Sequence, residues 1–300
     1  MPAARTLLLA VTLLCWACGS GAPPAAEAPA PSPAAEKAAE ARARLEASEG
    51  GRLVLAAIEA HGGLETWYAA PTSSACWEYS NPGAEMRFRS CMTVDNQTRR
   101  AYHDLEALGT PDDPQPYEGS FAWDGEQAWI FPADTPKVNP RFWALTGFYF
   151  SQIPFVLADP GVSYEKLPDE ELDGKTYSMV KCTFGSGVGD APGDHYILYI
   201  DPADQMVRAI RYTVTFGRGA RPAGKKAAGP PRETLFYYED YATADGLKTP
   251  QHFNGFWFDD GKQGEFKNEA WATNISYSQP FDESKLAMPE GGRVQPMPGE

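Results

Sequence analysis

The sequence has few of the residues that most often carry catalysis or bind metal ions. Among its 300 residues are four histidines, and no two of them stand at the spacing of a zinc-binding helix. No serine stands in a Gly-x-Ser-x-Gly turn, which marks the nucleophile of many hydrolases. The glycine-rich stretch 185–189 is followed by Asp190 and Pro192 instead of a helix that could bind phosphate, so we interpret it as a hairpin loop. We therefore expect no enzyme, no metal and no cofactor; the alternative is a hydrolase without a recognisable motif.

Positive charge and long hydrophobic runs are also scarce. The chain has 40 acidic and 26 basic side chains and a net charge of -14, and such an excess of acids repels the phosphate backbone of nucleic acids. Beyond the N-terminal apolar run, no segment offers the about 18 consecutive apolar residues that predict a transmembrane helix. We therefore expect neither a nucleic-acid partner nor a transmembrane helix in the rest of the chain.

The first 17 residues have the three parts of a secretory signal peptide. Residues 1–5 form a basic start, residues 7–14 an apolar run, and Ala17 a small residue at a processing point. The apolar run is shorter than the about 20 residues that span a bilayer. Cys18, followed by Gly19, resembles the lipobox cysteine of bacterial lipoproteins, whose sulfur receives a diacylglyceryl group. We predict a signal peptide over residues 1–17 and a lipid on Cys18; the alternative is cleavage near Ala17 without lipidation.

Residues 18–48 are predicted to form a tether. Up to residue 33 they are mostly Ala, Pro, Gly, Ser and Glu, which are too poor in large apolar groups to fold and favour extended chain. At about 3.1 Å per residue, residues 21–33 would span roughly 40 Å. Residues 34–47 contain helix-forming residues but almost no apolar stripe, so we expect a solvated helix or a disordered segment with little packing.

A single mainly β (α+β) domain is predicted over residues 49–300. It begins with a helix that carries apolar side chains on one face and ends at His61, where a partly charged imidazole suits the helix dipole in a structural role. Short β segments separated by turn dipeptides follow: 73–80, 86–95, 117–123, 127–131, 176–184, 194–200, 206–216, 233–242, 250–258 and 264–277. About ten sequential antiparallel strands favour an incomplete barrel wrapped around short helices.

Three further cysteines remain after Cys15 and Cys18. Two of them flank a segment with Asn81-Pro82-Gly83 near its middle, which predicts a hairpin. In that register three pairs face each other: Cys76 and Cys91, Glu78 and Arg89, and Tyr79 and Phe88. A disulfide between Cys76 and Cys91 is possible if their Cα atoms lie within about 7 Å. Cys182 is then left over and is predicted to be a buried thiol.

An aromatic segment at residues 142–157 interrupts the β pattern. It has too many rings for one helix face, so we predict short helices split near Gly147 and Pro154. The segment either plugs the concave side of the sheet or lines an apolar ligand cavity. For the second interpretation the candidate lining residues are Trp143, Phe148, Tyr149, Phe150, Phe155 and Leu157.

A basic stretch at residues 217–232 stands out in an acidic protein. It holds Arg218, Arg221, Lys225, Lys226 and Arg232 and no acidic residue. Its composition predicts a loop between two strands, which is either merely solvated or contacts anionic head groups or an acidic partner. Near a charged surface each such cation contributes about 1 kcal/mol.

Several turn and strand motifs resemble those of known proteins. They are Gly62-Gly63-Leu64, Leu172-Asp173-Gly174-Lys175, Tyr199-Ile200-Asp201-Pro202, Tyr238-Glu239-Asp240-Tyr241, Asp245-Gly246-Leu247, Gln279-Pro280-Phe281-Asp282 and Met288-Pro289. Over residues 52–295 the chain resembles a group of secreted bacterial proteins that are similar to the Lol-like periplasmic carriers and outer-membrane receptors of lipoprotein sorting.

The resemblance implies a half-barrel whose concave face receives acyl chains. We therefore expect a lipid-anchored envelope protein, at the outer membrane facing the periplasm, that binds an apolar ligand such as an acyl chain or a lipoprotein and is a monomer. The alternative is a structural or partner-binding envelope lipoprotein whose concave side is filled by its own side chains.

The lipidation site yields a direct prediction. Cys18→Ala removes the only cysteine preceded by Ala17 at the end of the apolar run, so the variant should carry no lipid. Metabolic labelling with palmitate checks this, with Cys15→Ala as the matched control that should still be labelled. Label retained by Cys18→Ala would contradict the assignment.

Overall fold

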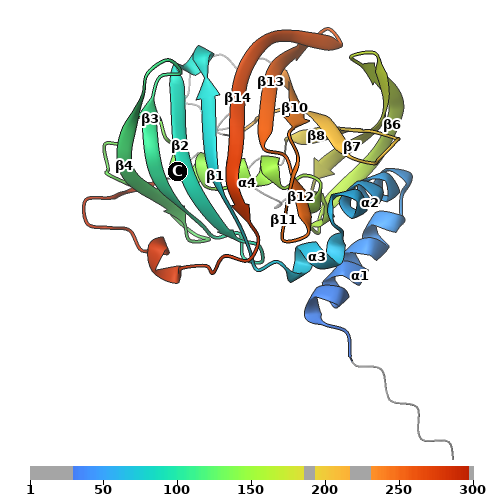
Figure 1. Cartoon of the computed structure of the whole chain (residues 1–300), viewed down its shortest axis with the longest axis horizontal. Coiled ribbons are helices and arrows are strands. Elements are labelled where there is room, and N and C mark those ends of the chain that lie inside the picture. Colours follow the sequence, from blue (N-terminus) through green and yellow to red (C-terminus); the bar gives the residue numbers. More distant parts are fainter. Residues whose placement is uncertain (1–29, 186–192, 217–230, 297–300) are drawn as a thin grey trace, which may run out of the picture. The chain divides into compact units, whose positions relative to one another are not determined.

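The computed structural model describes residues 30–185, 193–216 and 231–296, and the folded unit begins at Ser32. Its main element is an antiparallel sheet of 13 strands (Figure 1). These strands are β1 (Thr72–Asn81), β2 (Met86–Asp95), β3 (Ala101–Gly109), β4 (Pro114–Trp123), β5 (Ala128–Phe131), β6 (Val162–Leu172), β7 (Lys175–Phe184), β8 (His195–Ile200), β9 (Val207–Tyr212), β10 (Glu233–Glu239), β13 (His252–Asp259), β14 (Lys262–Ser276) and β15 (Arg293–Gln295). A separate two-stranded sheet consists of β11 (Ala242–Ala244) and β12 (Leu247–Thr249).

The sheet curls without closing. Its strand order is β15-β5-β4-β3-β2-β1-β14-β13-β10-β9-β8-β7-β6, so among the described residues β15 and β6 are edges that do not pair with each other. Most neighbours in the sheet are also neighbours in sequence, and the long-range pairing of β1 with β14 joins the two halves. The predicted fold class, a mainly β incomplete barrel around short helices, is confirmed.

Two long strands, β3 and β6, are absent from the sequence prediction. In β3, His103 occupies an inward position between the outward Tyr102 and Asp104, so the expected apolar alternation is broken by a buried polar residue. In β6, Pro168 and a run of charges hide the strand, and the pairing with β7 is irregular between Leu167 and Glu170. An edge strand tolerates proline because one of its sides forms no ladder.

The helices are α1 (Pro33–Glu46), α2 (Glu49–His61), α3 (Leu64–Ala69) and α4 (Pro140–Ser151), with 3-10 turns η1 (Pro82–Ala84), η2 (Phe155–Ala158) and η3 (Glu283–Leu286). In the described part of the chain, no helix is both long and apolar enough to cross a bilayer. Ser32, Ser48 and Asn139 cap the N-termini of α1, α2 and α4 by accepting a hydrogen bond from a backbone N–H.

The expectation that residues 34–47 pack little is wrong. Helix α1 buries Ala38, Ala41 and Leu45 and contacts α2 and α3, so the fold begins before residue 49. Small alanine side chains form this contact, which is why no broad apolar stripe marked it. The turn into α2 is also tight, because a Cβ atom on Gly51 would lie 2.1 Å from the carbonyl oxygen of Leu45.

The predicted hairpin between β1 and β2 is confirmed residue by residue. Cys76 faces Cys91, Glu78 faces Arg89 and Tyr79 faces Phe88. The two cysteines form a disulfide with Cα atoms 3.8 Å apart. Cys182 is a free buried thiol, as predicted, and burial raises its pKa.

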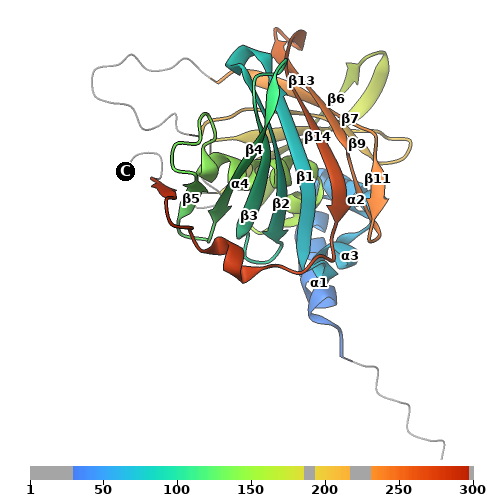
Figure 2. The ribbon, with the colours of Figure 1, turned by 60° about the vertical axis from the view of Figure 1, so that its left-hand side comes forward.

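The outer face of the sheet also carries apolar side chains, and other parts of the chain cover them. Beside β4 and β5, the segment after β14 runs across to β15 (Figure 2), and Trp129 Nε1 donates to the carbonyl of Leu286 at 2.7 Å. At the other end, Tyr199 of β8 is fully buried and donates its hydroxyl to Glu170 of β6 at 2.6 Å. These outer clusters therefore belong to the core and do not form an open surface.

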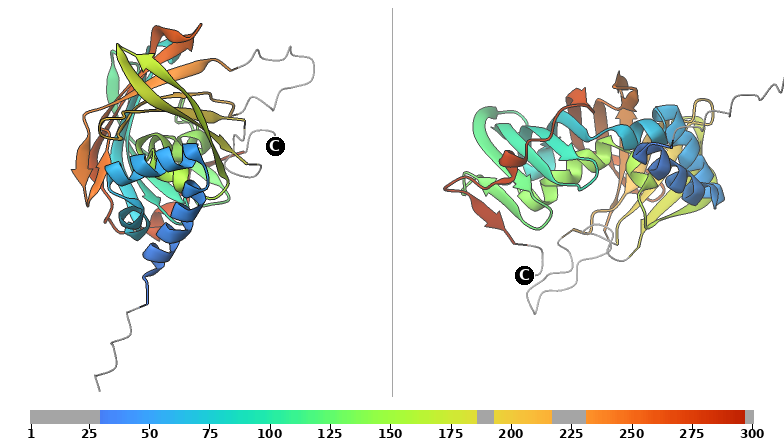
Figure 3. Two further views of the ribbon diagram at one scale, coloured as in Figure 1. Left: turned by 90° about the vertical axis from the view of Figure 1, so that its right-hand side faces the viewer. Right: turned by 90° about the horizontal axis from the view of Figure 1, so that it is seen from below.

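Helix α4 lies inside the curve of the sheet (Figure 3). His103 fixes it there: Nε2–H donates to the carbonyl of Ala144 at 3.0 Å, and Nδ1 accepts from the hydroxyl of Ser90 at 3.0 Å. The His103 ring also stacks on Phe121 with centroids 4.1 Å apart. The second buried histidine, His61, donates from Nδ1 to the carbonyl of Ala57 at 2.7 Å.

Both of these histidines are neutral in the fold. Burial lowers the pKa of His61 and of His103 to about 4, from an ordinary value of about 6.5. The expected partly charged imidazole at the end of α2 is therefore wrong, because desolvation outweighs the interaction of a charged ring with the helix dipole.

This burial predicts a loss of stability in mild acid. The unfolded chain binds these two protons first, so the free energy of unfolding is highest above about pH 6.5 and falls as the pH approaches 4. Each histidine should contribute a loss of about 2 kcal/mol between pH 7 and pH 5. Urea unfolding at both pH values checks this: His103→Gln and His61→Gln should each reduce the difference, and an unchanged difference in both variants would contradict it.

Candidate functional site

The aromatic segment forms one continuous helix followed by a 3-10 turn. The predicted interruption at Gly147 is wrong, because α4 runs unbroken from Pro140 to Ser151, whereas the predicted break at Pro154 is present before η2. Gly147 faces Trp77 of β1, and a Cβ atom there would lie 3.0 Å from the Cγ and Cδ2 atoms of the indole. Glycine therefore serves the close approach of helix and sheet at this position.

One face of this segment plugs the sheet. Trp143 packs on Tyr79 and Phe88, with ring centroids 4.7 Å away in both cases. Phe155 stacks on Trp67 of α3 at 5.1 Å. Trp143, Phe148 and Phe155 are buried in the main core, and none of these three predicted lining residues is among the residues that line the two hollows described below.

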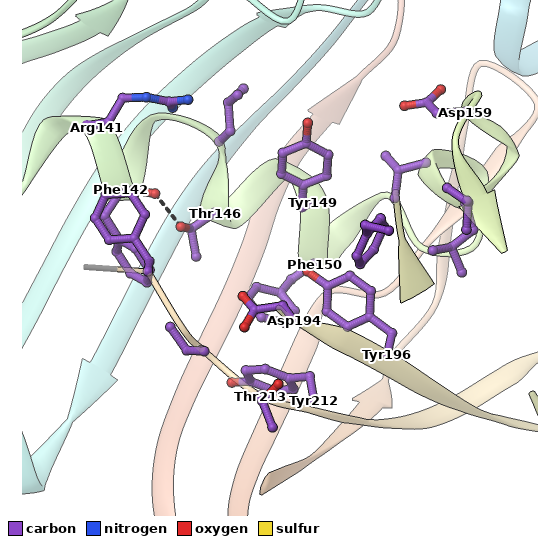
Figure 4. Close-up of a pocket in the computed structure, with 17 residues that line it drawn as sticks. Arg141, Phe142, Thr146, Tyr149, Phe150, Asp159, Asp194, Tyr196, Tyr212 and Thr213 are labelled. Carbon is purple, nitrogen blue, oxygen red and sulfur yellow. Dashed lines mark hydrogen bonds between the residues drawn. The ribbon is translucent and has the colours of Figure 1, made fainter. Parts of the chain in front are cut away.

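The other face of the segment lines a predominantly apolar pocket of about 200 Å³. Tyr149 and Phe150 on α4 lie across from Tyr196 of β8 and Tyr212 of β9 (Figure 4), and the Phe150 and Tyr212 ring centroids are 4.7 Å apart. Leu157 of η2 is the third predicted lining residue found there. Further apolar lining comes from Phe142, Leu145 and Val156 of the predicted segment, which were not among the six candidates, and from Val162, Phe184, Val214 and Phe216 outside it.

A few polar groups border the pocket, and most of them contact other residues of the protein. Asp159 forms an ion pair with Arg99 at 2.7 Å, and Asp194 accepts a hydrogen bond from the backbone N–H of Thr215 at 2.7 Å. The guanidinium of Arg141 lies 3.7 Å from the centre of the Trp123 ring. Thr213 differs, because its buried hydroxyl has no hydrogen-bond partner among the described residues.

The pocket offers apolar contact and little acid–base chemistry. Burial raises the pKa of the Tyr196 and Tyr212 hydroxyls, so both stay protonated at neutral pH. No histidine is among the described lining residues: His195 pairs with Glu233 at 2.9 Å and His252 with Glu269 at 2.7 Å, both outside the lining. Within the described ranges, the one cluster with metal-ligand geometry is Cys76, Cys91 and Glu106, whose two sulfurs are joined in the disulfide.

A second hollow, of about 520 Å³, lies beside α1 and α3 and is more polar. Three of its charged groups contact the protein itself: Arg44 donates to the carbonyl of Ala158 at 3.0 Å, and Arg99 pairs with Asp159. Sequence reasoning missed this hollow because residues 34–47 were not expected to pack.

Several predicted features lie outside the described residues. These are Cys18 with the signal peptide, most of the glycine-rich loop, and Arg218, Arg221, Lys225 and Lys226 of the basic stretch. Arg232 is described: it pairs with Asp259, and its guanidinium lies 4.2 Å from the Trp257 ring centre.

No family model and no curated protein matches the chain. Among solved structures, a LolA superfamily protein from Nitrosomonas europaea is 12% identical, covering 80% of this chain and 97% of its own, with a TM-score of 0.47. A putative outer membrane lipoprotein-sorting protein domain from Vibrio parahaemolyticus is 11% identical, with 84% and 96% covered and a TM-score of 0.37. The Mycobacterium tuberculosis lipoprotein LppX is 11% identical, with 78% and 99% covered and a TM-score of 0.28. Solved structures from the group that the sequence motifs resemble are thus among those similar to this chain.

The seating of α4 can be tested at Gly147. Gly147→Val would force the helix away from the Trp77 ring, and such overpacking costs roughly 1 to 3 kcal/mol of unfolding free energy. The control is Thr146→Ala on the pocket side of the same helix, which should cost less. Urea denaturation of both variants decides, and a Gly147→Val protein as stable as the wild type would show that the contact does not position the helix.

Proposed function

We propose that the protein is a carrier of the bacterial cell envelope that holds an apolar ligand, such as an acyl chain or the lipid of a lipoprotein. The ligand occupies the pocket between α4, η2 and strands β8 and β9. A lipid on Cys18 anchors the protein, at the outer membrane facing the periplasm. In this proposal the protein is a monomer, has no enzymatic activity and binds no nucleic acid.

The observation that carries the proposal is that the rings of the aromatic segment differ in burial. One set of rings is buried against the sheet and α3, whereas Phe142, Tyr149 and Phe150 are only partly buried at the pocket. Covering apolar surface contributes about 25 cal/mol per Å², so an apolar ligand gains free energy from the rings that the protein leaves open. Concave, mostly apolar surfaces with few polar groups are typical of small-molecule sites.

A second candidate function is a structural or partner-binding role. The pocket of about 200 Å³ is smaller than the about 300 to 1,000 Å³ of most ligand sites, and three of the six predicted lining residues fill the concave side themselves. In that case the aromatic segment acts mainly as a plug.

A pair of matched substitutions separates these two functions. Phe155→Ala removes a fully buried ring and should lower the free energy of unfolding by about 3 to 5 kcal/mol. Phe150→Ala removes a ring at the pocket and should cost less than half of that but weaken the binding of a fluorescent fatty acid. Thermal unfolding and probe titration are measured on both variants and on the wild type.

The outcome that refutes the carrier is equally specific. It is a large loss of stability in both variants together with no probe bound by the wild type. The structural role would then stand, with Phe150 as part of the plug.

A further inference from the structure

A row of side chains crosses the concave face of the sheet and leads from the pocket to Lys267 of β14. Tyr196, Tyr212, Thr234 and Trp257 are register partners on β8, β9, β10 and β13. The Lys267 ammonium reaches back along this row. It donates to the Thr234 hydroxyl at 2.6 Å and lies 4.5 Å from the Trp257 ring centre and 5.4 Å from that of Tyr212. Tyr212 is thus shared by the pocket wall and the surroundings of Lys267.

Lys267 has no anionic partner within the described part of the chain. Its hydrogen-bond acceptor is a neutral hydroxyl, whereas Lys166, Lys175 and Lys285 each pair with an aspartate. Its charged neighbour is another cation, Arg232. Burial, and next the charge of Arg232, lower the pKa of Lys267 to about 8, so the amine is still mostly charged at neutral pH. A poorly solvated cation without a counter-ion is unfavourable, and an anion beside it relieves the cost.

A second observation lies next to Tyr212 in the chain. Thr213 lines the pocket, is 5% exposed, and its hydroxyl has no partner among the described residues. Buried polar groups in folded proteins normally have a partner, so the unsatisfied Thr213 hydroxyl is unusual for a residue of the pocket wall. The pocket therefore has a cation beyond one wall and a free hydroxyl in the same wall.

From this geometry we propose that Lys267 is the anion-recognition group of the pocket, and that its ligand is an amphiphile with one apolar chain and an anionic head group, a carboxylate or a phosphate. The chain lies against Phe150 and Tyr196, and the head group passes Tyr212 to contact the Lys267 ammonium. This assignment rests on the proposed function, because it names the class of ligand that the same pocket holds.

The test compares three ligands that share one chain and differ in the head group: dodecanoate, dodecyl phosphate and dodecanol. Calorimetric titration, below the micelle-forming concentrations of the two anions and below the solubility limit of dodecanol, should give the wild type at least about tenfold higher affinity for an anionic ligand, the effect of one hydrogen bond to a charged group. Lys267→Met should lose this preference and bind all three as weakly as dodecanol. Lys262→Met is the matched control on an exposed lysine of the same strand and should behave as the wild type.

The possible outcomes separate this inference from the proposed function. Equal affinity of the wild type for dodecanol and for both anions overturns the role of Lys267 and leaves the apolar carrier standing. Binding of none of the three ligands overturns both. A preference for one anion supports the inference and distinguishes a carboxylate from a phosphate source. If Lys267→Met does not fold, Lys267→Arg replaces it in the test. This variant keeps the cation and must therefore retain the preference of the wild type for an anionic ligand. Loss of the preference in Lys267→Arg overturns the role of Lys267.

Discussion

The distance between α4 and the sheet is the constraint on which the rest of the concave side depends. Gly147 lets the helix lie directly on the Trp77 ring, and the hydrogen bond from His103 to the carbonyl of Ala144 holds it there. A helix held this close to β1 and β3 fills the space on that side completely. On its opposite side α4 reaches the other half of the sheet through fewer side chains, such as Phe150 on Tyr212, and the pocket lies there toward β8 and β9.

The same constraint explains why one aromatic segment fulfils two of the predicted roles. Side chains of α4 that point to the near half, such as Trp143, find rings within packing distance and become core. Side chains that point to the far half, such as Phe150, meet Tyr212 across the pocket and stay partly uncovered. Plug and lining are thus two faces of a single helix, and they follow from its position rather than from different sequences.

Local patterns in the sequence allowed the β1–β2 hairpin to be predicted in register, because a turn at residues 81–85 fixes it within a short stretch of chain. Features that depend on residues far apart in the sequence could not be predicted from such local patterns. Gly147 was interpreted as a helix interruption because its partner, Trp77, is far away in sequence. Three of the six predicted lining residues border the pocket, since residue type gives the apolar character of a side chain and only the fold gives its direction. No pattern in the sequence marks Lys267, because its surroundings come from three other strands.

Among the described residues Lys267 has no acidic partner, although the chain has more acidic than basic side chains. The chain has 40 acidic and 26 basic side chains, and three of its described lysines pair with an aspartate, as Lys175 does with Asp201. The partly buried amine of Lys267 is instead surrounded by two rings, a hydroxyl and a second cation. Such an arrangement lowers the stability of the isolated protein and raises its affinity for an anion, because a ligand charge then meets an amine that has no internal partner to give up.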